Sequence, residues 1–265
     1  MMIERLAPNM NPRLLSFSLL LISLGCQWIC GQSVKPLPNP SKAVYDRGSE
    51  ALNRGDFESA IINYANAIEL DPKNARAYAG RGAAKRLKGD YTGSLADLTR
   101  SIELDPNIQS SYYARAWVNL ILGHGDAAYG DAAKLLSFNE SNQMIFPSHV
   151  LIAYFGYRQA RRDAEADAYL RSAGSKLYSG AWATQIVRYL KHDVSDGQLI
   201  SSANGKKATI EARTYVGLDQ SLNGKKDSAL TNLHWVVANA DKRMFEYALA
   251  SAEIERLDSR ASKKN

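Results

Sequence analysis

Small, apolar and polar positions recur with a period of 34 residues in the first half of this chain. The stretch AIELDPKNARAY starts at Ala67, and a close copy, SIELDPNIQSSY, starts at Ser101. Between these copies the apolar residues follow the spacing of amphipathic helices in two successive blocks. The pattern predicts tandem helical hairpins, and no stretch of the sequence shows the alternation that is typical of a strand.

Two positions in each unit hold small side chains. In the units that start at residues 41, 75 and 109, they are the eighth and the twentieth: Gly48, Gly82 and Ala116, then Ala60, Ser94 and Ala128. Small residues let two helix backbones approach closely. We therefore expect the two helices of each hairpin to cross at these positions.

Glycine and proline mark the predicted helix ends. Glycine follows the first helix of each unit, where a left-handed residue costs least: Gly55, Gly89 and Gly123. Pro72 and Pro106 end the second helix, because proline cannot continue a helix. The repeated phrase is therefore the corner between one hairpin and the next.

Helix–turn–helix units of this length are typical of tetratricopeptide repeats (TPR), and the chain resembles that family from Ser41 onward. The resemblance implies an all-α fold, a right-handed TPR solenoid of helical hairpins. In such a solenoid the first helices line a concave groove, which binds a partner.

The later part of the chain departs from the repeat and then returns to it. Helical patterns cover residues 148–160, 163–177, 181–190 and 195–203, and a late unit begins at Ile210. The predicted organisation is an export segment (1–31), a Pro-rich linker (32–40), three TPR units (41–142), a divergent helical segment (143–209), a late TPR unit with a capping helix (210–258) and a polar tail (259–265).

The stretches WATQIVRYL, EARTYVGL and WVVAN, in this arrangement behind an export segment, resemble the NlpI-type bacterial TPR lipoproteins. That resemblance implies an envelope protease or a peptidoglycan hydrolase as the protein partner. It also implies an exported protein, either periplasmic or anchored to the membrane of the bacterial envelope as a lipoprotein. A homodimer is left open.

The N-terminal residues have the pattern of an export segment. Arg5 and Arg13 accompany an uncharged run, residues 14–25, which is too short to span a bilayer. The stretch SLGC before Cys26 resembles a bacterial lipobox, although Ser23 stands where that motif has an aliphatic residue. Lipidation of Cys26, simple cleavage near Gly31, a retained anchor extended through CQWIC and a buried core helix remain alternatives.

The net charge adds a second hypothesis about function. The chain has 33 Lys and Arg against 27 Asp and Glu, a formal net charge of +6. Such an excess suits an anionic partner, so binding of an anionic envelope polymer (cell wall or lipid headgroup) through a basic surface is the alternative. Binding of that kind weakens steeply with ionic strength, unlike a complex held by aromatic anchors.

No motif of known chemistry is present in the sequence. The four histidines show no zinc-binding spacing, and there is no nucleophile elbow: His124, His149, His192 and His234. Both cysteines, Cys26 and Cys30, lie in the export segment. We therefore expect no catalytic residue, no metal, no cofactor and no nucleic acid, and a protein that is not an enzyme. An enzyme of unrecognised type would need a titratable cluster in a pocket.

Arginine recurs at the seventh position of each early unit, and a polar partner follows sixteen residues later. The expected pairs are Arg47 with Asn63, Arg81 with Asp97, and Arg115 with Asp131. Pairs across the two helices of a hairpin fix their register, and we favour this role over binding of nucleic acid.

Positions two, five, nine and twelve of the first helices face the groove in this family. The candidate partner-binding residues are Tyr45, Ser49, Arg76, Ala83, Arg86, Tyr113 and Trp117. Tyr, Trp and Arg dominate binding hot spots, although a place for Trp117 in the core is an equal alternative.

The clamp that holds chaperone tails in some TPR grooves is not matched. In this chain the positions of that Lys/Asn/Lys/Arg clamp hold Tyr45, Ser49, Gly80, Ser110 and Ala114. We expect an exported, non-catalytic TPR scaffold that binds a protein partner in this groove.

Overall fold

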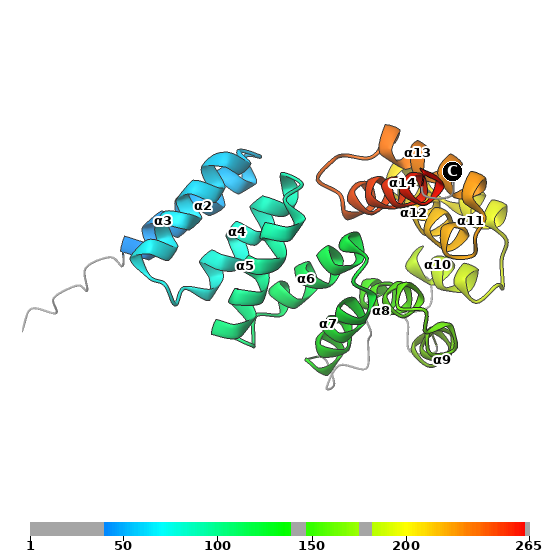
Figure 1. Ribbon diagram of the computed structural model, residues 1–265, viewed down its shortest axis with the longest axis horizontal. Coiled ribbons are helices and arrows are strands. Elements are labelled where there is room, and N and C mark those ends of the chain that lie inside the picture. Colours follow the sequence, from blue (N-terminus) through cyan, green and yellow to red (C-terminus); the bar gives the residue numbers. More distant parts are fainter. Residues whose placement is uncertain (1–39, 139–146, 175–181, 263–265) are drawn as a thin grey trace, which may run out of the picture. The chain divides into compact units, whose positions relative to one another are not determined.

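The computed structural model describes residues 40–138, 147–174 and 182–262, and every regular element in these ranges is a helix (Figure 1). The predicted all-α fold is confirmed. The predicted export segment and Cys26 lie outside the described residues. None of the described helices is both long and apolar enough to cross a membrane.

Three helical hairpins occupy the segment where the repeat is clearest. Their helices are α2 (Pro40–Asn53) with α3 (Phe57–Leu70), α4 (Ala75–Leu87) with α5 (Tyr91–Leu104), and α6 (Gln109–Leu122) with α7 (Gly125–Ser137). Each helix packs against the next one along the chain. Figure 1 shows these six helices stacked in order, from blue to green.

The divergent part and the late unit are also helical. Their helices are α8 (Pro147–Gln159), α9 (Asp163–Gly174), α10 (Trp182–Leu190), α11 (Asp196–Ser202), α12 (Gly205–Leu222), α13 (Lys226–Asn239) and α14 (Phe245–Ser262). Ser195 caps α11 in a reciprocal capping box with Gln198, as its position before that helix predicts.

The small positions lie at close helix crossings, as predicted. Ala60, Ser94 and Ala128 are fully buried. A Cβ added to Gly48 would lie 2.9 Å from the ring of Tyr64, and one added to Gly82 would lie 3.2 Å from the carbonyl oxygen of Ser94. Any larger side chain there would push the two helices of a hairpin apart.

The predicted left-handed caps are present. Gly55, Gly89 and Gly123 have φ angles of 80°, 86° and 81°. Two further residues, Arg161 and His192, have positive φ after α8 and α10 although neither is glycine. The sequence gives no sign of these two turns, because the residue type expected at such a position is Gly or Asn.

The largest hydrophobic core joins the third hairpin, the divergent segment and the C-terminal helices. It includes Trp117 of α6, Tyr154 of α8, Ile186 of α10, Tyr215 of α12 and Leu249 of α14. Helix α14 packs on α12 and α13 and also contacts α6. The chain's last helix therefore covers part of the surface that the first helices of the solenoid form.

Candidate partner-binding groove

An open cavity of about 950 Å³ lies over the first helices of the three early hairpins. Its lining includes Tyr45, Ser49, Leu52 and Asn53 of α2, Arg76, Ala79, Gly80 and Ala83 of α4, and Ser110 and Ala114 of α6. We call this surface the open groove. Four of the seven candidate residues line it: Tyr45, Ser49, Arg76 and Ala83.

The floor of the open groove is Tyr64, which comes from the second helix α3 and which the helix-position rule did not select. Its side chain is 2% exposed, and its hydroxyl lies 3.1 Å from Oγ of Ser49. A Cβ on Gly80 would lie 2.5 Å from the Tyr64 ring, so only glycine lets α4 rest on this ring. Burial raises the pKa of Tyr64 above its ordinary value, so it favours the neutral hydroxyl still further.

The other three candidate residues, Arg86, Tyr113 and Trp117, contact Phe245 at the start of α14. The Phe245 ring stacks on Trp117 at 5.1 Å between centroids and meets Tyr113 edge-on at 6.1 Å. Cζ of Arg86 lies 4.1 Å from the Phe245 centroid. Trp117 is 3% exposed in this structure, where the Phe245 ring covers its indole.

The sequence did not indicate Phe245 as a neighbour of these residues. It is the first residue of the capping helix, and a single aromatic residue there is ordinary in a helix that buries one face. The contact depends on how α14 folds back onto α6, which no local pattern encodes.

The predicted arginine pairs are present in the second and third hairpins. Arg81 donates to both carboxylate oxygens of Asp97, at 2.9 and 2.6 Å. Arg115 holds Asp131 in the same way, at 3.0 and 2.7 Å. In the first hairpin Arg47 is exposed, and Asn63 donates to the backbone carbonyl of Ser59.

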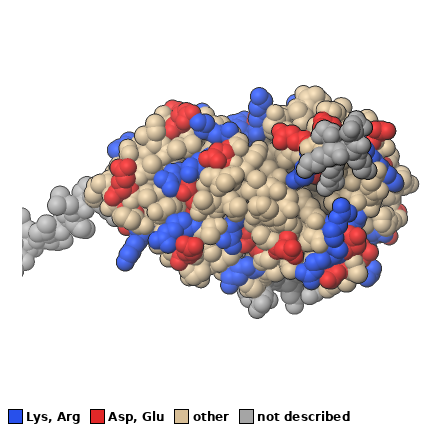
Figure 2. Space-filling model, viewed as in Figure 1, with Lys and Arg blue, Asp and Glu red and all other residues tan. Residues whose placement is uncertain are grey.

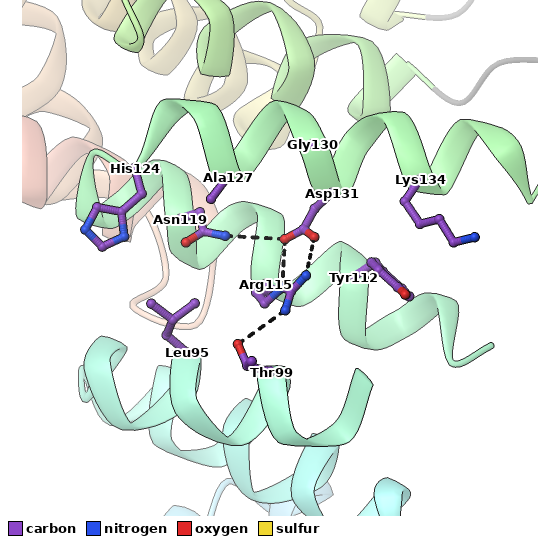
Figure 3. Close-up of a pocket in the computed structure, with 10 residues that line it drawn as sticks. All are labelled: Leu95, Thr99, Tyr112, Arg115, Asn119, His124, Ala127, Gly130, Asp131 and Lys134. Carbon is purple, nitrogen blue, oxygen red and sulfur yellow. Dashed lines mark hydrogen bonds and ion pairs between the residues drawn. The ribbon is translucent and has the colours of Figure 1, made fainter. Parts of the chain in front are cut away.

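The Arg115 pair lines a second cavity of about 630 Å³ between α5 and α7, shown in Figure 3. In this view Arg115 also donates a hydrogen bond to Thr99, and Asn119 donates one to Asp131.

The two buried aspartates differ in their second partner. Asp97 has a second cation, Lys85 at 2.8 Å, whereas the second partner of Asp131 is the neutral amide of Asn119. Burial raises the pKa of Asp131, because its carboxylate is 5% exposed. The carboxylate of Asp131 is thus already hydrogen-bonded to residues of its own hairpin.

We expect Asp131→Ala to lower the free energy of unfolding by about 3 kcal/mol, because it leaves Arg115 largely buried without a counter-charge. The double substitution Arg115→Leu with Asp131→Leu should cost less than the sum of the single ones. Urea denaturation of the wild type, Asp131→Ala, the two single Leu variants and the double Leu variant measures both quantities. Additive losses would show that the pair makes no interaction of consequence.

A further buried ion pair ties the divergent segment to the late unit. Nη1 of Arg158 lies 3.5 Å from Oδ1 of Asp219, and the hydroxyl of Tyr189 donates to Oδ2 of Asp219 at 3.1 Å. Burial raises the pKa of Asp219. These groups connect α8, α10 and α12. Among the described residues, no cluster of His, Cys, Asp and Glu is suited to hold a metal ion.

Comparisons with known proteins agree with this architecture. Residues 48–85 match the family model of the TPR repeat. The solved structure of a tetratricopeptide repeat protein from Parabacteroides merdae is similar, with a TM-score of 0.56 and 15% identity over 91% of this chain and 98% of that chain. No curated protein matches the chain.

Two other solved structures align with parts of this chain. The MamA protein aligns with a TM-score of 0.48 and 17% identity over 78% of this chain and 95% of that chain. The TPR2B domain of yeast Sti1, in a pHsp70 complex, aligns with a TM-score of 0.40 and 21% identity over 45% of this chain and 97% of that chain. The repeat match and the helical hairpins together show that this chain carries a tetratricopeptide repeat at residues 48–85 within an all-α, TPR-like solenoid.

Proposed function

We propose that this protein is a non-catalytic TPR scaffold that binds a segment of a protein partner in the open groove. The observation that carries the proposal is the composition of that cavity. Small residues in its lining, such as Ala79, Gly80 and Ala83, leave room for a partner's backbone. Tyr45 and Arg76 in the same lining are of the residue types that supply most binding energy in protein interfaces.

Three buried carboxylates that a catalytic site could use have structural roles instead. Asp97, Asp131 and Asp219 are buried and each is paired with an arginine. None of the three lines the open groove, and Asp131, which lines the cavity of Figure 3, is already hydrogen-bonded to Arg115 and Asn119. This arrangement favours a scaffold over an enzyme of unrecognised type, which would concentrate such groups in a pocket.

The alternative, an anionic polymer as ligand, gains no support from the surface seen in Figure 2. On that face Lys and Arg side chains are interspersed with Asp and Glu, and neither sign forms a continuous stripe. Binding of a polyanion relies on a run of one charge sign. We therefore retain the protein partner as the first proposal.

The binding site is tested by Ala83→Arg, which places a long charged side chain in the middle of the open groove. The expected result is a loss of partner affinity of about tenfold or more, because partner contacts along the groove are blocked. Capture from a bacterial envelope extract with the tagged full chain, followed by titration with the captured protein, measures it. The matched control is Ile62→Arg on α3, because Ile62 is 58% exposed and does not line the open groove.

Equal loss of binding in both variants, or in neither, would contradict a site in the open groove. Repeating the titration at several salt concentrations separates the two proposals for the ligand. An affinity that falls steeply with salt and does not respond to Ala83→Arg would indicate an anionic polymer.

We also propose that the protein is exported and works in the bacterial envelope, anchored through a lipid on Cys26. The lipobox-like stretch before Cys26 supports the anchor. The resemblance to NlpI-type lipoproteins supports an envelope protease or a peptidoglycan hydrolase as the partner. The mass of the mature N-terminus tests the anchor: a diacylated cysteine is expected, and a chain that keeps residues 1–25 would contradict export with cleavage.

A further inference from the structure

The groove-facing sides of α4 and α6 continue past the open groove. Ala83 and Ala114 line the open groove, and Arg86 and Trp117 each lie three residues further along the same helix. Residues at this spacing share one side of a helix. Arg86 and Trp117 therefore extend the open groove. Tyr113, one turn before Trp117 on α6, contacts the same Phe245 ring, and we call Arg86, Tyr113 and Trp117 the ring subsite.

The ring subsite holds one flat side chain of the protein itself. The Phe245 ring lies at 21° to the Trp117 ring and at 89° to the Tyr113 ring, with the Arg86 guanidinium over it. Stacked, edge-on and cation–π contacts to a single ring are the geometry by which proteins recognise an aromatic group. The contact surface is thus shaped for a ring, whichever chain supplies it.

Two polar groups of the ring subsite are incompletely paired among the described residues. The guanidinium of Arg86 forms no ion pair with a described carboxylate; its hydrogen bond goes to the backbone carbonyl of Arg243, at 3.3 Å. Burial lowers the pKa of Arg86, and only tyrosines act against that effect. The indole Nε1–H of Trp117 is buried and has no described hydrogen-bond acceptor. An incoming anionic group would meet a buried cation and a free donor.

We propose that the ring subsite is a second pocket of the groove, which takes an aromatic side chain next to a carboxylate from the partner, and that Phe245 fills it until such a segment displaces it. This inference rests on the proposed function, since it assigns partner chemistry and regulation to the same groove. Phe245 thus competes with the partner for the ring subsite. The apparent association constant is the intrinsic one multiplied by the fraction of molecules in which Phe245 is out of the ring subsite.

Displacement of Phe245 does not require α14 to leave its place. Phe245 is the first residue of α14 and follows the exposed stretch Asp241, Lys242 and Arg243. Further along, Leu249 is buried in the main core, and Arg256 donates to the carbonyl of Ile121 at 3.0 Å. The ring can therefore swing out of the ring subsite while the rest of the helix stays docked.

The test uses a fluorescein-labelled peptide of residues 241–250, DKRMFEYALA, as the probe, and a matched peptide with alanine in place of its phenylalanine. Fluorescence anisotropy measures its binding to the full-length protein. The variant Phe245→Ala is expected to bind the probe about tenfold more tightly than the wild type, because its ring subsite is empty. The matched peptide should show no such gain, and adding Arg86→Gln to Phe245→Ala should remove most of it.

Two further variants keep the outcome decisive. Phe245→Leu keeps an apolar side chain at the start of α14, so it preserves the docking of this helix better than Phe245→Ala does, and it should still bind the probe more tightly than the wild type. Trp235→Ala is the control, because it removes another arginine-over-ring contact, Arg213 at 4.8 Å, outside the groove. Far-UV circular dichroism confirms the fold of each variant.

The proposal is overturned if folded Phe245 variants bind the probe no better than the wild type, or if Trp235→Ala gives the same gain. The proposed function fails separately, if Ala83→Arg leaves partner binding unchanged. If Ala83→Arg abolishes partner binding while Phe245→Ala leaves it unchanged, the open groove stands as the site and the ring subsite does not.

Discussion

We expect Tyr64→Ala to lower the free energy of unfolding by about 4 kcal/mol, in the range measured for buried aromatic residues that are truncated to alanine. The Tyr64 ring is almost fully buried and lies against Gly48 of α2 and Gly80 of α4. Its removal leaves a cavity between the first two hairpins. Because repeats are held by contacts with their neighbours, amide hydrogen exchange should accelerate most in α2, α3 and α4.

The control for this prediction is Tyr64→Phe. It keeps the ring and removes only the hydroxyl that lies 3.1 Å from Ser49 Oγ, so we expect a cost of about 1 kcal/mol. Chemical denaturation with exchange measured by mass spectrometry follows both variants. Similar losses for alanine and phenylalanine would show that the hydroxyl, and not the packing of the ring, holds the first two hairpins together.

Gly125→Ala should destabilise the protein by about 3 kcal/mol, because α7 and α8 touch backbone to backbone at this point. A Cβ on Gly125 would lie 2.4 Å from the carbonyl oxygen of Gly156 and 2.7 Å from the amide nitrogen of Ala160. No flexible side chain can yield there, so the two helices must separate. The third hairpin would lose its contact with the divergent segment.

A glycine on the same helix provides the matched control. Gly130 has open space around an added Cβ, and alanine is favoured over glycine within a helix, so Gly130→Ala should stabilise the protein by up to about 1 kcal/mol. The two melting temperatures should therefore move in opposite directions. A Gly125→Ala variant that melts at or above the wild-type temperature would contradict the close approach of α7 and α8.

The hairpins could be predicted because their determinants are local and repeated. Gly55, Gly89 and Gly123 recur at the helix ends and all adopt positive φ. Small residues recur at the crossings, and a pair such as Arg81 with Asp97 is separated by a fixed interval within one hairpin. A period of this kind supplies the same physical constraint several times, so one irregular unit does not hide it.

The groove was only partly predictable, for a physical reason. The helix-position rule selected Tyr45, Ser49, Arg76 and Ala83 because it depends on one hairpin at a time. It did not select Tyr64, which enters from a second helix, or Phe245, which arrives from the far end of the chain. Contacts between distant helices depend on the curvature of the whole stack, and a periodic pattern contains no information about where that stack meets its own last helix.

Photo-cross-linking from Asn53 tests most directly whether the open groove holds the partner. Asn53 is exposed and lines this surface, so a benzophenone amino acid placed there in the full-length protein samples whatever occupies it. A control chain carries the same amino acid at the exposed Ile62 of α3. We predict a protein adduct from position 53 that is absent from position 62 and is lost with Ala83→Arg. An adduct that forms equally at position 62, or that persists at position 53 with Ala83→Arg, would contradict binding in the open groove.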